Sequence, residues 1–145
     1  MYKLYVFVRS DLESLNSGRL GAQTAHAASQ CAEYHLIMPF GSYSRDSYEE
    51  WSKDYGFGTS IVLDGGSFEC EPFNMDYDFA GKSWSFYNNG VEFHMIHDPT
   101  YPLKDGKVMH YLSINTCYWV FGDPELDDKL KEYLARFKLY NGNHD

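Results

Sequence analysis

The fold is decided by two stretches near the N-terminus, Val8-Arg9-Ser10-Asp11-Leu12 and Ser17-Gly18-Arg19-Leu20-Gly21-Ala22-Gln23-Thr24-Ala25-His26-Ala27-Ala28. The residues in front of them, Tyr2–Val8, are rich in β-branched and aromatic side chains and predict a buried strand. Polar residues over Arg9–Gly18 predict a loop. From Arg19, apolar and small residues recur every three or four positions, which predicts a helix that ends near Pro39.

The rest of the chain continues as alternating helices and strands. Helices are expected over Arg45–Tyr55 with Ser44 as its cap, over 76–88, and over Pro124–Phe137 with Asp123 as its cap. Strands are expected at Thr59–Leu63, Val91–Ile96, Val108–Ile114 and Cys117–Phe121, followed by an extended Lys138–Tyr140. Two prolines and a glycine indicate a loop over Asp98–Lys107.

This order of elements predicts an α/β protein. The expected architecture is a single-domain, three-layer α/β/α sandwich around a mixed, mostly four-stranded sheet, with residues 1–140 in the domain and 141–145 as a frayed tail. The first strand–loop–helix unit places the start of the long helix at the carboxyl edge of the sheet. Backbone N–H groups at such an edge favour anionic ligands, so a binding site is expected there.

Charge and cysteine content restrict the class of protein. The 21 acidic residues give a net charge of −9, which argues against tight binding to long nucleic acids unless the cations gather locally. The three cysteines are widely spaced and odd in number, so we expect reduced core thiols and neither a disulfide framework nor a zinc ribbon. With no long apolar run and no signal-peptide pattern, we expect a cytoplasmic protein.

The two opening stretches resemble the signature of type II peptidyl-tRNA hydrolases, which reads V-R-x-D-L, a short loop and G-K-x-A-A-Q-x-x-H-A. Weaker similarities to that family occur at Ile61–Leu63, Ile96–Asp98, Leu112–Ile114 and Phe137–Tyr140. The resemblance implies the family's fold and a cleft between the start of the first helix, the end of the third strand and the fourth strand. It also implies a homodimer, since family members often pair.

The resemblance further implies a set of site residues. In the family a helix-start Lys, a Gln four residues later, an Asp and a Thr twelve residues after that Asp are tied to hydrolysis of the ester that joins a peptide to tRNA. The Lys position is Arg19 here, while Gln23 and Asp98 match, and the spacing of the Thr leads to His110. The family's Ala-Gly-Arg-Thr after the Asp is replaced by Pro99-Thr100-Tyr101.

Arg19 bears most directly on the chemistry. A cation at a helix start opposes the helix dipole, which suggests an anion to hold, although a solvated surface cation is the alternative. Lysine can act as a base when it loses a proton, whereas arginine stays protonated. Arginine can still stabilise an oxyanion or hold a phosphate with two hydrogen bonds, so Arg19 favours binding over proton transfer.

The remaining candidates each have a functional and a structural interpretation. Asp98 can orient water, pair with Arg19 or contact a ribose hydroxyl, or it is a turn residue. Gln23 can bind a ligand or lie on the helix surface, and His110 can act as a base, stack on a nucleobase or be held by neighbouring strands. Tyr101 can stack on a base or belong to the core.

Other histidines are expected to be structural. His26 is expected to be packed, with its ring held by a hydrogen bond. His94 and His97 are three apart on a strand, point to opposite faces and are not expected to share a metal.

Two functions follow from these residues. The favoured hypothesis is a binder that holds a nucleotide-like or RNA-derived anionic ligand through Arg19, Gln23, Asp98, His110 and Tyr101, without turnover. By analogy with small phage-encoded proteins, such a binder would sequester a nucleotide signal in the host cytoplasm. The alternative is an active peptidyl-tRNA hydrolase with Asp98 and His110 as catalytic residues. A partner-binding domain is a third, weaker hypothesis, and no cofactor or metal is expected in any of them.

Overall fold

The computed structural model describes residues 1–12, 15–67 and 90–141. Its centre is an open, mixed sheet with the strand order β2-β1-β4-β3. The strands are β1 (Lys3–Val8), β2 (Ser60–Asp64), β3 (Glu92–Asp105) and β4 (Val108–Gly122). β1 is parallel to β2 and antiparallel to β4, and β3 and β4 form an antiparallel hairpin.

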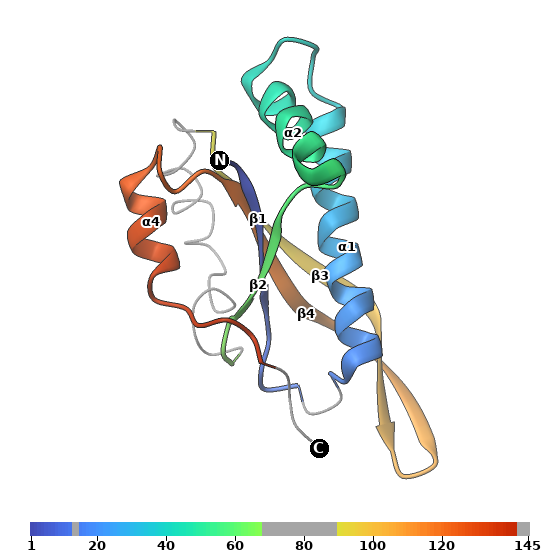
Figure 1. The fold of residues 1–145 in the computed structure, drawn as a ribbon. Coiled ribbons are helices and arrows are strands. Elements are labelled where there is room, and N and C mark those ends of the chain that lie inside the picture. Colours follow the sequence, from blue (N-terminus) through green and yellow to red (C-terminus); the bar gives the residue numbers. More distant parts are fainter. Residues whose placement is uncertain (13–14, 68–89, 142–145) are drawn as a thin grey trace.

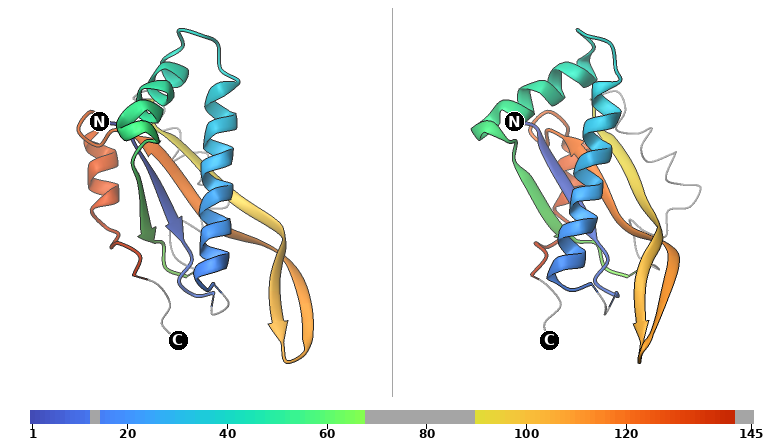
Figure 2. Two further views of the ribbon diagram at one scale, coloured as in Figure 1. Left: turned by 45° about the vertical axis from the view of Figure 1, so that its right-hand side comes forward. Right: turned by 90° about the vertical axis from the view of Figure 1, so that its right-hand side faces the viewer.

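Helices cover both faces of this sheet. α1 (Ser17–Leu36) and α2 (Tyr43–Lys53) lie on one face, and α4 (Asp128–Leu134) lies on the other (Figures 1 and 2). A short 3-10 helix, Asp54–Gly56, leads from α2 towards β2. The predicted α/β/α sandwich with a four-stranded mixed sheet is thereby confirmed.

β1 is buried on both of its faces. Leu4, Val6 and Val8 join the core beneath α1 and α2. Tyr5 and Phe7 face the opposite way, into the core beneath α4. Because side chains alternate along a strand, a two-sided core requires a continuous apolar run, which explains why the sequence of β1 shows no polar alternation.

α1 begins two residues earlier than predicted. The side chain of Asn16 accepts a hydrogen bond from the backbone N–H of Arg19 at 3.1 Å and caps the helix, so the loop ends at Asn16 and not at Gly18. Arg19 is therefore the third residue of α1, and Gln23 follows one turn later. The position of both residues at the start of the helix is retained.

Two other helix starts were also predicted wrongly. α2 is capped by Ser42 and not by Ser44. α4 begins at Asp128 behind the cap Asp127, and it ends at Leu134 rather than Phe137. The carboxylate of Asp123 instead binds the N-terminal amine at 2.6 Å and the backbone N–H of Glu125 at 2.9 Å, which makes a turn where a helix was expected.

The largest correction concerns the segment expected to be a loop, Asp98–Lys107. It is mostly strand, because β3 runs on to Asp105 and turns at Gly106-Lys107 into β4. The predicted strands at Val108–Ile114 and Cys117–Phe121 are likewise one strand. β3 is an edge strand, so Pro99 and Pro102 are tolerated there where they would disrupt an inner strand.

The C-terminal prediction is confirmed. Lys138–Tyr140 runs along the outer edge of β2, where the backbone N–H of Asp64 donates to Lys138 O at 2.8 Å and that of Tyr140 donates to Val62 O at 3.0 Å. The helix predicted over 76–88 and most of the predicted tail lie outside the described residues. In the described part of the chain, no helix has the length and apolarity needed to cross a membrane.

Gly58 and Gly41 provide a test of the packing between α2 and β2. Both have a positive φ, +76° and +80°, but a Cβ at Gly58 would lie 2.5 Å from the Trp51 ring, while a Cβ at Gly41 would meet nothing within 4 Å. Gly41→Ala should lower the free energy of unfolding by about 1–2 kcal/mol, through backbone strain alone. Gly58→Ala should lower the free energy of unfolding by about 1–3 kcal/mol more than Gly41→Ala, because the new methyl group overpacks against Trp51. Urea unfolding followed by tryptophan fluorescence measures both, and equal losses would contradict this packing.

Candidate functional site

The side chain of Gln23 joins three elements. It extends from α1, is 3% exposed, and donates from Nε2 to Asp98 Oδ2 on β3 at 2.7 Å. Its Oε1 accepts a hydrogen bond from Thr116 Oγ1 on β4 at 2.5 Å. Since an amide has a distinct donor end and acceptor end, these two bonds fix its orientation. The structure thus brings together Gln23 and Asp98, as the sequence predicted, and adds Thr116.

Irregularities in the β3–β4 ladder explain how Thr116 reaches this position. Ile96 pairs with Cys117 while the next residue of β3, His97, pairs with Asn115, so Thr116 is an extra residue on β4. A second irregularity follows between Asp98 and Tyr101. Bulges turn a side chain away from the regular alternation and are frequent beside functional sites. Here they accompany the meeting of Asp98 and Thr116 at one amide.

Asp98 is held as a carboxylate. Its Oδ1 accepts the backbone N–H of Thr100 at 2.8 Å, and its Oδ2 accepts the amide of Gln23. Burial raises the pKa of Asp98, but the hydrogen bonds from Gln23 and Thr100 and the charge of His26 outweigh it, so the pKa lies below its usual value. A half-buried carboxylate in this state accepts hydrogen bonds from water or hydroxyl groups and is not a proton donor at neutral pH.

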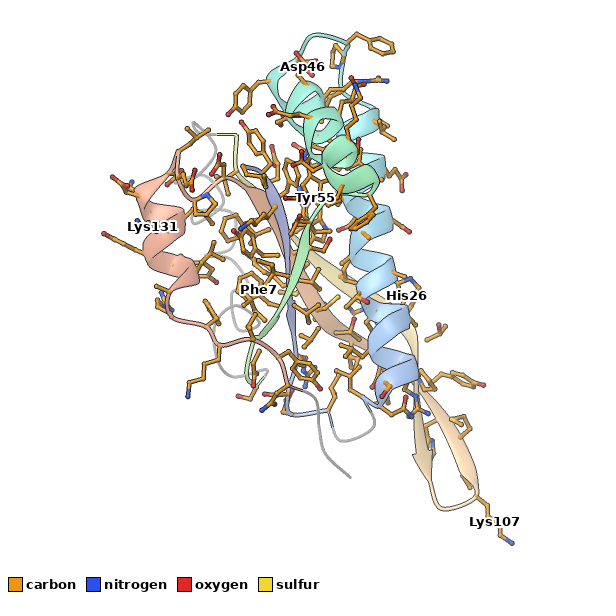
Figure 3. The ribbon with its side chains drawn as sticks, viewed as in Figure 1. Phe7, His26, Asp46, Tyr55, Lys107 and Lys131 are labelled. Carbon is orange, nitrogen blue, oxygen red and sulfur yellow. The ribbon has the colours of Figure 1, made fainter. Side chains whose placement is uncertain are left out.

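A groove of about 450 Å³ opens beside Asp98, between α1 and β3. Its lining residues are His26, Ser29, Gln30, Glu33, Ile96, His97, Asp98, Pro99 and Thr100. His26, labelled on α1 in Figure 3, is exposed and lines the groove, so the prediction that it is packed is wrong. The groove is therefore lined by two imidazoles, His26 and His97, and by two carboxylates, Glu33 and Asp98.

Arg19 lies one helical turn before Gln23. It is half-buried, and its side chain is not among those that line the groove. It lies at the start of α1, seven residues before His26, which is the first residue of the helix to line the groove.

Two predicted site residues lie elsewhere. His110 pairs with Leu103 in the hairpin, and Asp98 pairs with Ile114, so His110 is four positions farther along β4, about 13 Å at 3.3 Å per residue. Lys107, at the hairpin tip in Figure 3, shows how far this arm reaches from the body. Tyr101 is 0% exposed in the core beneath α1, so its ring is not an open stacking surface.

The cysteines and other histidines near the site have separate partners. Cys31 and Cys117 are buried free thiols, as predicted, while Cys70 lies outside the described residues. Burial raises the pKa of Cys117 to about 12, so this thiol, next to Thr116, stays protonated and is no nucleophile. His94 stacks on Trp119, with ring centroids 4.6 Å apart, while the ring of His97 bonds to Asn115 and Ser113.

This geometry defines an α/β protein with a polar site at the start of its first helix, against a bulged hairpin. The family model described as peptidyl-tRNA hydrolase PTH2 matches residues 2–69, which include β1, α1, α2 and β2. The match covers 68 of the 145 residues, and over this part the chain is similar to the peptidyl-tRNA hydrolase family. Asp98 and Thr116 lie outside the matched residues, and both side chains bond to that of Gln23. No curated protein matches the chain.

Thr116 and His26 are the site residues that sequence reasoning missed. A fixed spacing of twelve residues from Asp98 led to His110, whereas the long hairpin places Thr116 eighteen residues after Asp98. Nothing in the sequence indicates the bulge. The exposure of His26 had a weak signal, because His26 and Ser29 lie three apart on the helix and share a face.

Thr116→Val tests the bonds of the buried amide. The substitution keeps the shape but leaves Gln23 Oε1 without its hydroxyl donor, and an unsatisfied buried group costs about 1–3 kcal/mol. The free energy of unfolding in urea should fall by that amount. Thr24→Val on the outer side of α1 is the matched control and should change it by less than about 0.5 kcal/mol. Similar losses for the two variants would argue against the bond.

Proposed function

We propose that the chain hydrolyses the ester that joins a peptide to the terminal ribose of tRNA. The observation that carries this proposal is the bonded set Gln23–Asp98–Thr116 beside an open groove. The family resemblance ties a Gln, an Asp and a Thr to this reaction. By spacing alone, the family's Thr falls at His110. In this proposal Thr116 takes the place of that Thr and supplies its hydroxyl group.

In this proposal Asp98 orients the attacking water. After accepting hydrogen bonds from Gln23 and Thr100, its carboxylate still has lone pairs that can accept the O–H of a water. Its lowered pKa keeps the group ionised. The water oxygen attacks the ester carbonyl carbon, its proton passes to the imidazole of His26, and the ribose oxygen leaves and takes up a proton. Arg19 contributes only charge, near an anionic part of the ligand.

Gln23 and Thr116 act through Asp98 and are positioning residues. The amide of Gln23 is fixed at both ends, so it holds one carboxylate oxygen in place without a conformational search. Such preorganisation lowers the barrier because no group has to reorient during the reaction. Loss of the Gln23 amide should therefore lower kcat more than it changes KM.

Asp98→Asn is the most direct substitution. The variant keeps the size of the side chain but loses the negative charge that orients water, and kcat for peptide release from peptidyl-tRNA should fall by about 100-fold or more. His110→Gln, in the exposed arm, is the control and should leave kcat unchanged. Release of peptide is measured with a labelled peptidyl-tRNA. Full activity of Asp98→Asn, or none in the parent protein at high concentration, would refute the proposal.

Arg19 supports a second candidate function, in which the groove holds a nucleotide-like or RNA-derived anion without turnover. Arginine binds phosphate well but does not transfer protons, and it stands where the family has lysine. The replacement of Ala-Gly-Arg-Thr by Pro99-Thr100-Tyr101 adds to this argument, as does the net charge of −9, which disfavours long tRNA. Sequestration of a nucleotide signal would be one use of such a binder.

A matched pair of variants separates the two functions. If the groove only binds, Arg19→Lys should retain binding of adenosine 5′-monophosphate, while Arg19→Gln should weaken it at least about tenfold through loss of the cation. If the chain is a hydrolase, Arg19→Lys should maintain or raise peptide release. Calorimetric titration measures the binding of adenosine 5′-monophosphate, and the labelled-peptide assay measures peptide release. Binding that is indifferent to the charge at Arg19 would contradict the second candidate.

A further inference from the structure

A second constellation of reactive side chains lies on the base of the hairpin. His97 Nε2 is 2.7 Å from Ser113 Oγ, and His97 Nδ1 is 2.8 Å from Asn115 Oδ1. None of these three residues takes part in the Gln23–Asp98–Thr116 set. Together they form a serine–histidine–asparagine chain of hydrogen bonds.

The donors and acceptors in these hydrogen bonds are arranged as they are around an activated serine. Asn115 Oδ1 can only accept, so Nδ1 of His97 carries the proton. In the neutral ring Nε2 is then unprotonated and accepts a hydrogen bond from the Ser113 hydroxyl. This is the arrangement in which a histidine removes the proton of a serine nucleophile while a third group holds the ring.

The hairpin bulge produces this arrangement. His97 pairs with Asn115 directly after the register shift at Ile96, so the two side chains lie across from each other. Ser113 is two residues from Asn115 on β4 and reaches the other nitrogen of the same ring. The backbone carbonyl of Asn115 accepts from Arg9 Nη1 at 3.0 Å, which ties this part of β4 to the body.

The three side chains open onto a pocket of about 380 Å³ that Arg9 and Ile114 complete. Ser113 and His97 are exposed, so a substrate can reach the hydroxyl. The Arg9 guanidinium forms part of the pocket wall and is held there by two bonds to Asp11, at 2.8 Å and 2.9 Å. The Ile114 side chain adds an apolar wall, and a pocket of this size suits a small carboxylic ester.

We propose that Ser113, His97 and Asn115 form a second, nucleophilic esterase centre, with Ser113 as nucleophile, His97 as base and Asn115 as its positioning residue. Ser113 Oγ attacks the ester carbonyl carbon and its proton passes to His97 Nε2. The alcohol leaves with that proton, and water then hydrolyses the acyl-serine and restores the hydroxyl. This chemistry goes beyond the proposed function and needs neither Asp98 nor Arg19.

A fluorophosphonate tests the nucleophile directly. Ser113 Oγ forms a bond to phosphorus, fluoride leaves, and the proton passes to His97, so the product is a stable adduct. Cleavage after Lys107 and Lys129 yields the peptide Val108–Lys129, in which Ser113 is the single serine, and mass spectrometry of that peptide locates the label. We expect labelling at Ser113 and none in Ser113→Ala.

Three further variants separate catalysis from simple exposure. His97→Gln, which keeps hydrogen-bonding capacity but loses the base, should slow labelling about 100-fold. Asn115→Asp should retain rapid labelling. Asp98→Asn should leave the labelling rate unchanged, so this test is independent of the proposed function. Thermal melting verifies that each variant is folded. Labelling of Ser113 no faster than that of the exposed Ser29, or equal rates in His97→Gln, would overturn the proposal and leave a hydrogen-bonded surface cluster.

Discussion

The buried amide of Gln23 is the constraint on which the site depends. The side-chain amide of a residue that is 3% exposed needs partners for its nitrogen and its oxygen, or its burial costs a few kcal/mol. Asp98 and Thr116 supply them from two different strands. A single side chain therefore links α1 to the edge strand β3 and to its neighbour β4. The same bonds fix the orientation of the Asp98 carboxylate.

The same interaction decides what the site can do chemically. Hydrogen bonds from Gln23 and Thr100 keep the pKa of Asp98 below its usual value despite burial, so the group serves as an acceptor and a fixed charge. Another group must then take up the proton, and His26 is one of the two imidazoles, with His97, that line the same groove. Arg19 supplies charge without proton transfer. An ester hydrolase and a binder of anionic ligands differ here only in whether water is admitted and a proton is moved.

The sequence predicted Gln23 and Asp98 as site residues but not Thr116. Asp98 was predictable from a weaker similarity at Ile96–Asp98, and the strand–loop–helix unit and Gln23 were predictable because periodicity and a dense family resemblance specify them locally. Thr116 was not, because its place depends on one extra residue in β4, and a bulge of this kind leaves no compositional trace. Pro99 and Pro102 indicated a loop where an edge strand tolerates them, and the burial of Tyr101 depends on tertiary packing beneath α1.

The most direct measurement is a crystal structure with a peptidyl-adenosine analogue in which an amide replaces the labile ester. We expect the linkage carbonyl to lie in the groove between His26 and Asp98, with a water bonded to Asp98 about 3 Å away. The Gln23 amide should still be bonded to Asp98 and Thr116. An analogue bound away from this groove, or a groove that stays empty at saturating concentration, would contradict it.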